Sequence, residues 1–215
     1  MAAKVPIVDD HPMMREGLRT LISRERDLTV CGEAETTGQA LDALTNLNPD
    51  LVLADIALPG RGGVDLIKDI RALRPAVLVL VISMHDELLY AERALRAGAR
   101  GYIMKQESGP RMMQAIRQVL AGHIYLSGKM SARILEHVAS KSAKASSVER
   151  LSDREFEVFQ LIGGGKSTAQ IAKELHLSTK TVEAHRAHVK EKLDLKTMPE
   201  LISFAARWVE TQDMH

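Results

Sequence analysis

Short apolar runs alternate with segments of helical period through the first half of the chain. The runs cover residues 5–8, 28–34, 51–55, 77–83 and 101–104. Between the first two runs, apolar residues recur at the i, i+4, i+7 and i+8 spacing of one helix face, at Met14, Leu18, Leu21 and Ile22. Five strand-like runs joined by helices predict an α/β unit, a doubly wound parallel sheet covered by helices on both faces.

The strand-like runs stop after Gly122, and the remaining chain has helical period. Residues 127–140 are typical of one helix, and residues 141–150 form a linker rich in Ser, Ala and Lys. Four further helical segments follow at residues 151–162, 166–175, 177–193 and 198–209. We therefore predict an α/β domain at 1–122, a linker helix and tether at 123–148, and an all-α domain at 149–215.

Capping residues mark where the helices of the second half begin. Ser152 precedes Glu155 by the three positions of a capping box, and Ser167 precedes Gln170 in the same way. Ser178 is the expected cap of the third segment.

The composition narrows the class of protein. A length of 215 residues with 45% hydrophobic residues suits one large or two small domains. The formal net charge of +1 gives no whole-chain signature of nucleic-acid binding, so a DNA-binding function has to rest on a local patch. The single cysteine, Cys31, excludes an internal disulfide. No apolar stretch reaches the roughly 20 residues of a membrane helix and no signal-peptide pattern is present, so we expect a cytoplasmic protein with no membrane partner.

The sequence Gly-Gly-Gly-Lys-Ser-Thr at residues 163–168 raises the question of a phosphate-binding loop. That motif requires another glycine five residues before Gly165, where this chain has Gln160. It also requires a buried strand before the glycines, and residues 151–162 contain no β-branched apolar run. We therefore interpret the glycines as a turn between two helices and disfavour a nucleotide-hydrolysing enzyme.

Polar side chains follow the predicted strands at the edge where parallel sheets bind ligands. Asp9 and Asp10 follow the first strand, and Asp55 ends the third. Each acid could simply cap the next helix. Together, three converging carboxylates repel one another unless a hard cation such as Mg²⁺ joins them. Ser83 and Lys105 follow the last two strands and supply the hydroxyl and ammonium that suit an anion attached to a carboxylate.

Three stretches carry a resemblance to a known family: VDDHPMMREGL, DLVLADIALPGRGGVDLI and RGYIMKQES. They resemble the receiver domain of a two-component response regulator, which has a flavodoxin-like fold. With the helical half, the chain resembles the NarL/FixJ type, whose output domain is a LuxR-like helix-turn-helix. The resemblance covers nearly the whole chain.

The resemblance implies roles for particular residues. Asp55 would accept a phosphoryl group from a sensor histidine kinase. Mg²⁺ would be held by Asp9, Asp10, Asp55 and the backbone carbonyl of Ala57. Ser83 and Lys105 would bind the phosphoryl oxygens, and Tyr102 would change rotamer on phosphorylation. Apart from this Mg²⁺-dependent self-phosphorylation, we expect no enzymatic activity.

Pro6 departs from the family pattern, because it lies where this fold places a central strand. Proline has no N–H to donate to a sheet. We expect a locally weakened first strand with the acid site preserved.

The third helical segment is expected to be the recognition helix, which lies in the DNA major groove. Val182, His185, Val189 and Leu193 share one face, so His185 is interpreted as a packed residue. The opposite face includes His188. The family pattern points to Glu183, Ala184 and Ala187 as groove-facing and favours phosphate contacts for Lys180, Thr181, Arg186 and Lys190. This patch is modest in charge, so we expect specific binding to require a homodimer.

The last helix places Leu201, Ile202, Ala205 and Trp208 on one stripe, which favours either core packing or a dimer contact. We predict a transcriptional regulator in which phosphorylation of Asp55 changes dimerisation and promoter binding. The alternative is a phosphorylation-dependent adaptor whose helical domain binds protein.

Overall fold

The computed structural model describes residues 2–59, 62–139 and 147–213. Contacts divide the chain into two compact units, Met1–Ala139 and Ser140–His215. The helix predicted within the linker, α6 (Gly128–Ala139), makes its contacts with the first unit. Most of the predicted tether, residues 140–146, lies outside the described residues.

The first unit contains a five-stranded parallel sheet, as the alternation of apolar runs predicts. Its order is β4-β2-β5-β6-β7. The bounds are β2 (Ile7–Val8), β4 (Glu33–Ala34), β5 (Leu51–Ala54), β6 (Leu78–Ser83) and β7 (Gly101–Met104). β2 is the first strand of this sheet along the chain, and it lies between β4, the second, and β5, the third. The strand order therefore reverses between β2 and β5. Ligands bind at such a switch point, beyond the carboxyl ends of the strands.

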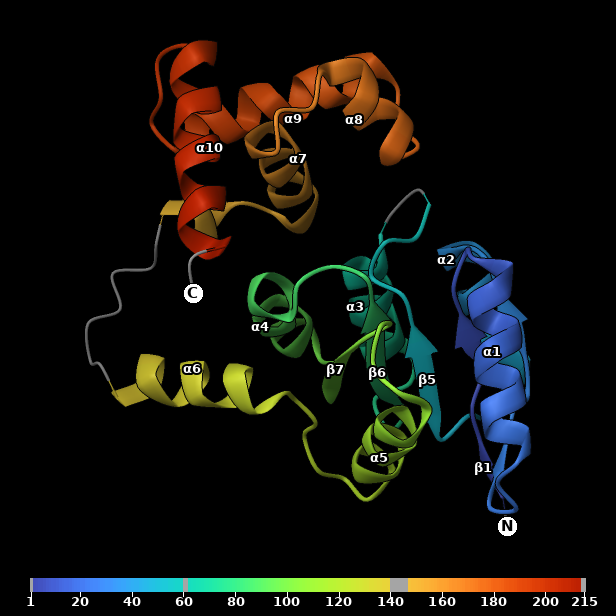
Figure 1. The fold of residues 1–215 in the computed structure, drawn as a ribbon. Helices are drawn as coiled ribbons and strands as arrows, with labels where there is room; N and C mark the ends of the chain where they lie inside the picture. The colour runs from blue at the N-terminus through green and yellow to red at the C-terminus, as the bar shows by residue number, and fades with distance from the viewer. Residues whose placement is uncertain (1, 60–61, 140–146, 214–215) are drawn as a thin grey trace. The chain divides into compact units, whose positions relative to one another are not determined.

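Helices cover both faces of this sheet (Figure 1). α1 (Pro12–Ser23) packs beside α5 (Gly109–Leu120). Three more helices pack side by side, namely α2 (Thr37–Asn46), α3 (Gly63–Leu73) and α4 (Glu87–Ala97). Leu18 and Ile22 of α1 and Ile116 of α5 join Leu53 and Leu80 of the sheet in one buried cluster. The period of the α1 sequence thus places its apolar face on the sheet.

A bulge interrupts the strand pairing beside Pro6. Short strands β1 (Ala3–Lys4) and β3 (Leu28–Thr29) pair with each other before the main sheet begins. Val5 N–H donates to the Thr29 carbonyl at 2.8 Å and Ile7 N–H donates to the Gly32 carbonyl at 3.0 Å. The partner therefore carries one extra residue opposite Pro6, which is a bulge. The run at 28–34, predicted as one strand, is divided for this reason into β3 and β4.

After α5 the chain returns to the sheet and pairs with β7. Tyr125 forms a parallel bridge with Gly101. Tyr102 N–H donates to the Tyr125 carbonyl, and Tyr125 N–H donates to the Arg100 carbonyl, each at 3.0 Å. This pairing fixes the segment that leads into α6.

The second unit is helical, and its capping signals are confirmed. A 3₁₀ turn (Ser147–Arg150) precedes α7 (Asp153–Gly163), α8 (Thr168–Glu174), α9 (Thr179–Lys192) and α10 (Met198–Asp213). Capping boxes formed by Ser152 with Glu155 and by Ser167 with Gln170 begin α7 and α8. The Ser178 side chain accepts a hydrogen bond from Thr181 N–H at the start of α9. Phe156 and Phe159 of α7 pack edge-on against Trp208 of α10.

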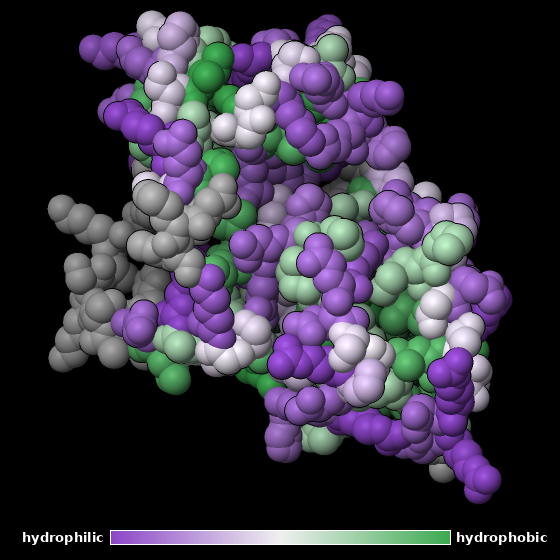
Figure 2. Space-filling view, viewed as in Figure 1, coloured by the Kyte–Doolittle hydropathy of each residue, from purple (hydrophilic) through white to green (hydrophobic). Residues whose placement is uncertain are grey.

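The described helices are all too short or too polar for a bilayer crossing. Hydrophilic residues cover most of the surface visible in Figure 2, with hydrophobic residues in small groups between them.

Candidate functional site

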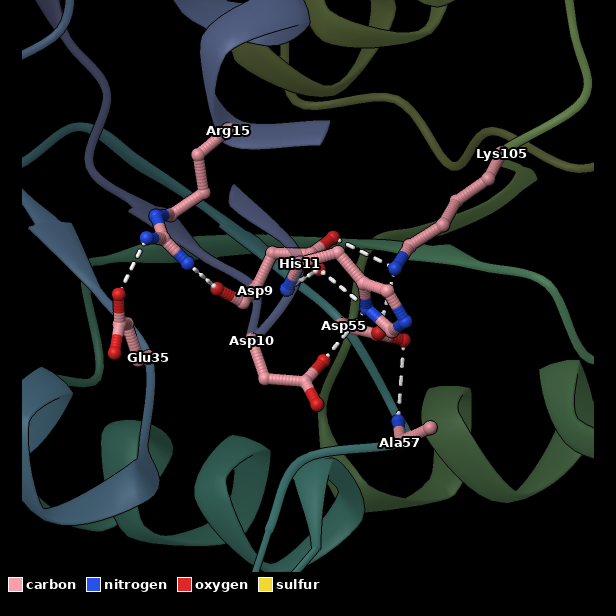
Figure 3. A network of polar contacts seen from close by, with 8 residues as sticks. All are labelled: Asp9, Asp10, His11, Arg15, Glu35, Asp55, Ala57 and Lys105. Atoms are coloured by element: carbon pink, nitrogen blue, oxygen red, sulfur yellow. Dashed lines mark hydrogen bonds and ion pairs between the residues drawn. The ribbon is translucent and has the colours of Figure 1, made fainter. Parts of the chain in front are cut away.

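Three of the predicted site residues meet at the carboxyl edge of the sheet. Asp9 follows β2, Asp55 follows β5, and Lys105 follows β7. Both acids are 2% exposed. Lys105 Nζ lies 2.7 Å from Asp9 Oδ2 and 2.7 Å from Asp55 Oδ2. Figure 3 shows Lys105 reaching the acids from the side opposite Arg15.

Lys105 keeps its proton despite this burial. Desolvation acts to lower its pKa, but the charge and hydrogen bond of Asp55, followed by those of Asp9, outweigh it and raise the pKa above its ordinary value. The ammonium therefore stays charged at neutral pH.

The acid cluster has the composition of a cation site. One ligand atom from each of Asp9, Asp10, His11 and Asp55 lies within 4.8 Å of the other three. Three carboxylates face one ammonium, so negative charge remains to be balanced. Asp10 Oδ1 is buried and accepts no hydrogen bond from the described residues, although His11 Nδ1 is 2.7 Å away. Carboxylate oxygens are ligands of hard divalent cations, so these residues fit a metal ion.

The structure adds His11 and Arg15, to which sequence analysis assigned no role. Arg15 Nη1 donates to the Asp9 backbone carbonyl at 2.6 Å, and Nη2 lies 2.5 Å from Glu35 Oε1. Arg15 thus holds the loop that carries Asp9 and Asp10 in place (Figure 3). Its sequence signal is a cation on the buried face of α1, in line with Leu18 and Ile22.

Both ends of the loop between Asp55 and α3 lie close to Asp55. Ala57 N–H donates to Asp55 Oδ1 at 3.1 Å. Gly63 begins α3 so near this loop that a Cβ there would lie 2.2 Å from the Asp55 carbonyl oxygen. Only glycine permits this approach.

Ser83 and Tyr102 lie inside the first unit and share one neighbour, His85. Both are fully buried. Ser83 Oγ accepts from His85 N–H at 3.1 Å, and the Tyr102 hydroxyl donates to the His85 carbonyl at 2.8 Å. Burial raises the pKa of Tyr102 far above its ordinary value, so its hydroxyl remains a donor.

The glycines at 163–165 terminate a helix. The N–H groups of Gly164, Gly165 and Lys166 donate to the carbonyls of Gln160, Ile162 and Leu161, which lie in the last turn of α7. Those N–H groups are therefore not directed at a phosphate. The Lys166 ammonium pairs with Glu174. The turn interpretation is confirmed.

The recognition-helix candidate, α9, presents most of its predicted DNA-facing residues to solvent. The exposed ones are Lys180, Thr181, Glu183, Ala184, Ala187 and His188, while Arg186 and Lys190 are half-buried. On the opposite face Val182 and Val189 are fully buried and His185 is half-buried. Burial, followed by the charge of Arg154, lowers the pKa of His185. This environment agrees with a packed histidine.

Several side chains of the exposed face are held in place. Glu183 Oε1 accepts from the Thr168 hydroxyl at 2.7 Å and lies 3.3 Å from Arg186 Nη1. Arg186 also donates to Thr168, and its side chain is only 16% exposed. Arg186 of α9 and Thr168 of α8 therefore orient the Glu183 side chain together. The Arg186 guanidinium is less accessible to a DNA phosphate than the Lys180 ammonium.

The stripe on α10 is divided between packing and exposure. Leu201 and Ala205 are fully buried, and Trp208 packs on α7. Ile202 remains 45% exposed. Core packing thus accounts for three of the four residues.

Two family models match the chain. Residues 5–117 match the response regulator receiver domain, and residues 149–205 match the luxR family of bacterial regulatory proteins.

Relatives and solved structures of similar organisation cover almost the whole chain. The oxygen regulatory protein NreC of Staphylococcus haemolyticus is 33% identical over 210 residues, covering 95% of this chain and 97% of NreC. A putative transcriptional regulator of Pseudomonas aeruginosa is 35% identical over 205 residues, covering 95% of this chain and 98% of its own. RcsB of Salmonella enterica, solved on promoter rprA with the phosphomimetic BeF3⁻, aligns with a TM-score of 0.63 at 25% identity, covering 96% of this chain and 99% of RcsB. The chain belongs to the response regulators that join a receiver domain to a LuxR-type helix-turn-helix domain.

Proposed function

We propose that the chain is a transcriptional regulator whose binding to promoter DNA is controlled by phosphorylation of Asp55. The observation that carries the proposal is the contact of Lys105 with both Asp9 and Asp55 at the carboxyl edge of the sheet. This contact supports the proposal because the Lys105 ammonium could neutralise charge on a phosphoryl group attached to Asp55. We propose residues 1–122 as the phosphoacceptor domain and residues 149–215 as the DNA-binding domain, with the limits that the sequence predicts.

In the proposed reaction, a carboxylate oxygen of Asp55 attacks the phosphorus atom of a phosphohistidine on a sensor kinase in the cytoplasm. An O–P bond forms, the P–N bond breaks, and the imidazole keeps the electron pair. Such transfers depend mainly on positioning and charge neutralisation. The Lys105 ammonium and the Ser83 hydroxyl would meet the phosphoryl oxygens, since Lys105 Nζ lies 2.7 Å from Asp55 Oδ2 and Ser83 ends β6, the strand beside β5.

We propose Mg²⁺ as the cation, with Asp9, Asp10, Asp55 and the Ala57 carbonyl as ligands. Bound there, Mg²⁺ would neutralise charge on the transferred phosphoryl group. The proposal is supported by the uncompensated charge of the cluster and by Asp10 Oδ1, a buried oxygen that accepts no hydrogen bond from the described residues and lies 2.7 Å from His11 Nδ1.

The proposed DNA-reading residues are Glu183, Ala184 and Ala187, with phosphate contacts from Lys180, Thr181, Lys190 and, more weakly, Arg186. His188 lies on the same DNA-facing side of α9. Glu183 can accept a hydrogen bond from cytosine, and the alanines can contact a thymine methyl group. These readers are few, so a homodimer on paired half-sites would supply the affinity. A solved structure of RcsB contains two dimers bound to two parallel DNAs, which supports this arrangement.

The proposal is tested by selecting duplexes from a random library with BeF3⁻-treated protein and measuring their binding with and without BeF3⁻. We expect tighter binding and dimer formation with BeF3⁻ and no such response in Asp55→Asn. Equal affinity and equal oligomeric state in both conditions would refute phosphorylation control. Failure to select any duplex, together with phosphorylation-dependent capture of a protein, would favour the adaptor function.

A further inference from the structure

The loop at residues 83–87, called here the 83–87 loop, connects the proposed phosphoryl site to α4. Ser83 at one end accepts a hydrogen bond from His85 N–H. The Tyr102 hydroxyl binds the His85 carbonyl, and the His85 ring lies 5.0 Å from that of Tyr90. Glu87 at the other end is the first residue of α4. The loop is thus held at His85 by contacts with Tyr102 and Tyr90. Its first residue, Ser83, has a proposed role in binding the phosphoryl group.

Glu87 makes a contact that its own helix does not require. Asp86 caps α4, because its side chain accepts from Leu88 N–H at 2.8 Å. The Glu87 side chain instead accepts from the backbone N–H of Ser127, also at 2.8 Å, across 40 positions of sequence. Glu87 is only 7% exposed. A carboxylate so buried is costly without a hydrogen-bond donor, so this contact is a strong constraint.

Ser127 directly precedes Gly128, the first residue of α6. Its hydroxyl accepts from Met130 N–H at 3.1 Å, and its carbonyl accepts from Ser131 N–H at 2.9 Å. Met130 is 1% exposed and anchors the first turn, which packs near α4. α6 is also the last described element before the chain passes into the DNA-binding half. The position of its first turn is therefore set by the same loop that carries Ser83.

The surroundings leave room for these residues to rearrange. A cavity of about 260 Å³ is bordered by Glu87, Tyr102, Tyr125 and Ser127, with Glu107 on its lining as well. Packed interiors do not deform smoothly, so a shift of Ser83 has to be taken up by a change of contacts. The Glu87 contact is adjacent to open space and is suited to such a change.

We propose that Glu87 is a positioning residue that couples the phosphoryl site to α6 through its hydrogen bond to Ser127. This inference rests on the proposed function, since it assumes that Ser83 moves when Asp55 is phosphorylated. For coupling to exist, the bond must differ in strength between the two states. Glu87 takes no part in the phosphoryl transfer itself.

The test compares three full-length variants with the native chain. Glu87→Ala removes the acceptor, and Glu87→Gln keeps an oxygen that can accept from Ser127. Glu107→Gln is the matched control, because Glu107 lines the same cavity but pairs with Arg111. Hydrogen exchange of residues 127–136 and the ratio of DNA affinities with and without BeF3⁻ are measured. Acetyl phosphate labelling of Asp55 is followed in parallel.

We expect α6 amides in Glu87→Ala to exchange about tenfold faster than in the native chain, the loss expected for a charged hydrogen bond. The affinity ratio should fall toward one in Glu87→Ala and stay native in Glu87→Gln and Glu107→Gln, with Asp55 labelled in all. If Glu87→Ala keeps both the protection of α6 and the affinity ratio, the coupling is refuted while the proposed function stands. If the native chain is neither labelled nor responsive to BeF3⁻, the proposed function itself fails.

Discussion

Lys105 Nζ donates to Asp55 Oδ2 over 2.7 Å, joining residues 50 positions apart in the chain. The Lys105 side chain is 6% exposed and Asp55 is 2% exposed, so this pair is buried. Removing one member of a buried pair leaves the other charge without compensation. We therefore expect the contact to contribute to stability as well as to the proposed chemistry.

The first prediction concerns the stability of the receiver unit. Lys105→Met should lower its free energy of unfolding by about 3 kcal/mol in EDTA, because Asp9 and Asp55 then lie buried without a counter-ion. Mg²⁺ should restore part of the loss. Hydrogen exchange of β5 and β6 amides in denaturant measures the change.

Lys68→Met is the control, since Lys68 pairs with Asp65 at the surface. It should change the stability by less than about 0.5 kcal/mol. Equal effects of the two substitutions would mean that the buried contact contributes nothing.

The second prediction concerns the bulge opposite Pro6. Amides of β1 and β3 should exchange faster than those of β5 and β6, because the bulge opposite Pro6 interrupts pairing at that edge. Hydrogen exchange with peptide-level mass spectrometry gives the order. The strongest protection in residues 3–8 would contradict this reading of Pro6.

The third prediction concerns the acid stability of the second unit. Burial acts to raise the pKa of Glu155, but the hydrogen bonds from Lys192 and Ser152 outweigh it, so the pKa lies below its ordinary value of 4.5. A carboxyl whose pKa is lowered on folding contributes stability above its unfolded pKa. That contribution should therefore be lost as pH falls below 4.5 through the folded pKa.

Denaturant unfolding followed by Trp208 fluorescence tests this, because Trp208 is the single tryptophan and lies in the second unit. Glu155→Gln should be less stable than the native chain at pH 7, and the difference should shrink in acid. The control Glu191→Gln, at an exposed position, should follow the native curve. If the stability difference between Glu155→Gln and the native chain does not change with pH, the Glu155 charge does not contribute to stability.

The fourth prediction distinguishes α9 residues that contact DNA phosphates from those that recognise bases. Lys180→Ala should weaken binding to all duplexes alike and reduce the salt slope by about 1, because Lys180 is assigned to a phosphate. Glu183→Ala should instead change the preferred sequence. Binding titrations at several salt concentrations, followed by reselection from the random library, distinguish the two. A change of sequence preference in Lys180→Ala would reverse the assignment.

The sequence predicts those features that depend on local pattern. Capping boxes at Ser152 and Ser167 could be located because the signal spans four residues. The acid site could be predicted because parallel strands bring their carboxyl ends to one edge, whatever the details of packing.

Features that depend on the tertiary path could not be predicted in the same way. Nothing near Glu87 indicates that its partner is the N–H of Ser127. The half-buried position of Arg186 depends on Thr168 of a neighbouring helix. The second strand is divided at the bulge that lies opposite Pro6 in the neighbouring strand. In each case the determining residue is distant in sequence.

The proposed function depends on the transfer of a phosphoryl group to Asp55. The most direct test is the intact mass of the native chain and of Asp55→Asn after incubation with Mg²⁺ and acetyl phosphate. We expect one phosphoryl adduct on the native chain, none on Asp55→Asn, and none on either when Mg²⁺ is withheld. An adduct on Asp55→Asn, or no adduct on the native chain with Mg²⁺ present, would contradict the proposed function.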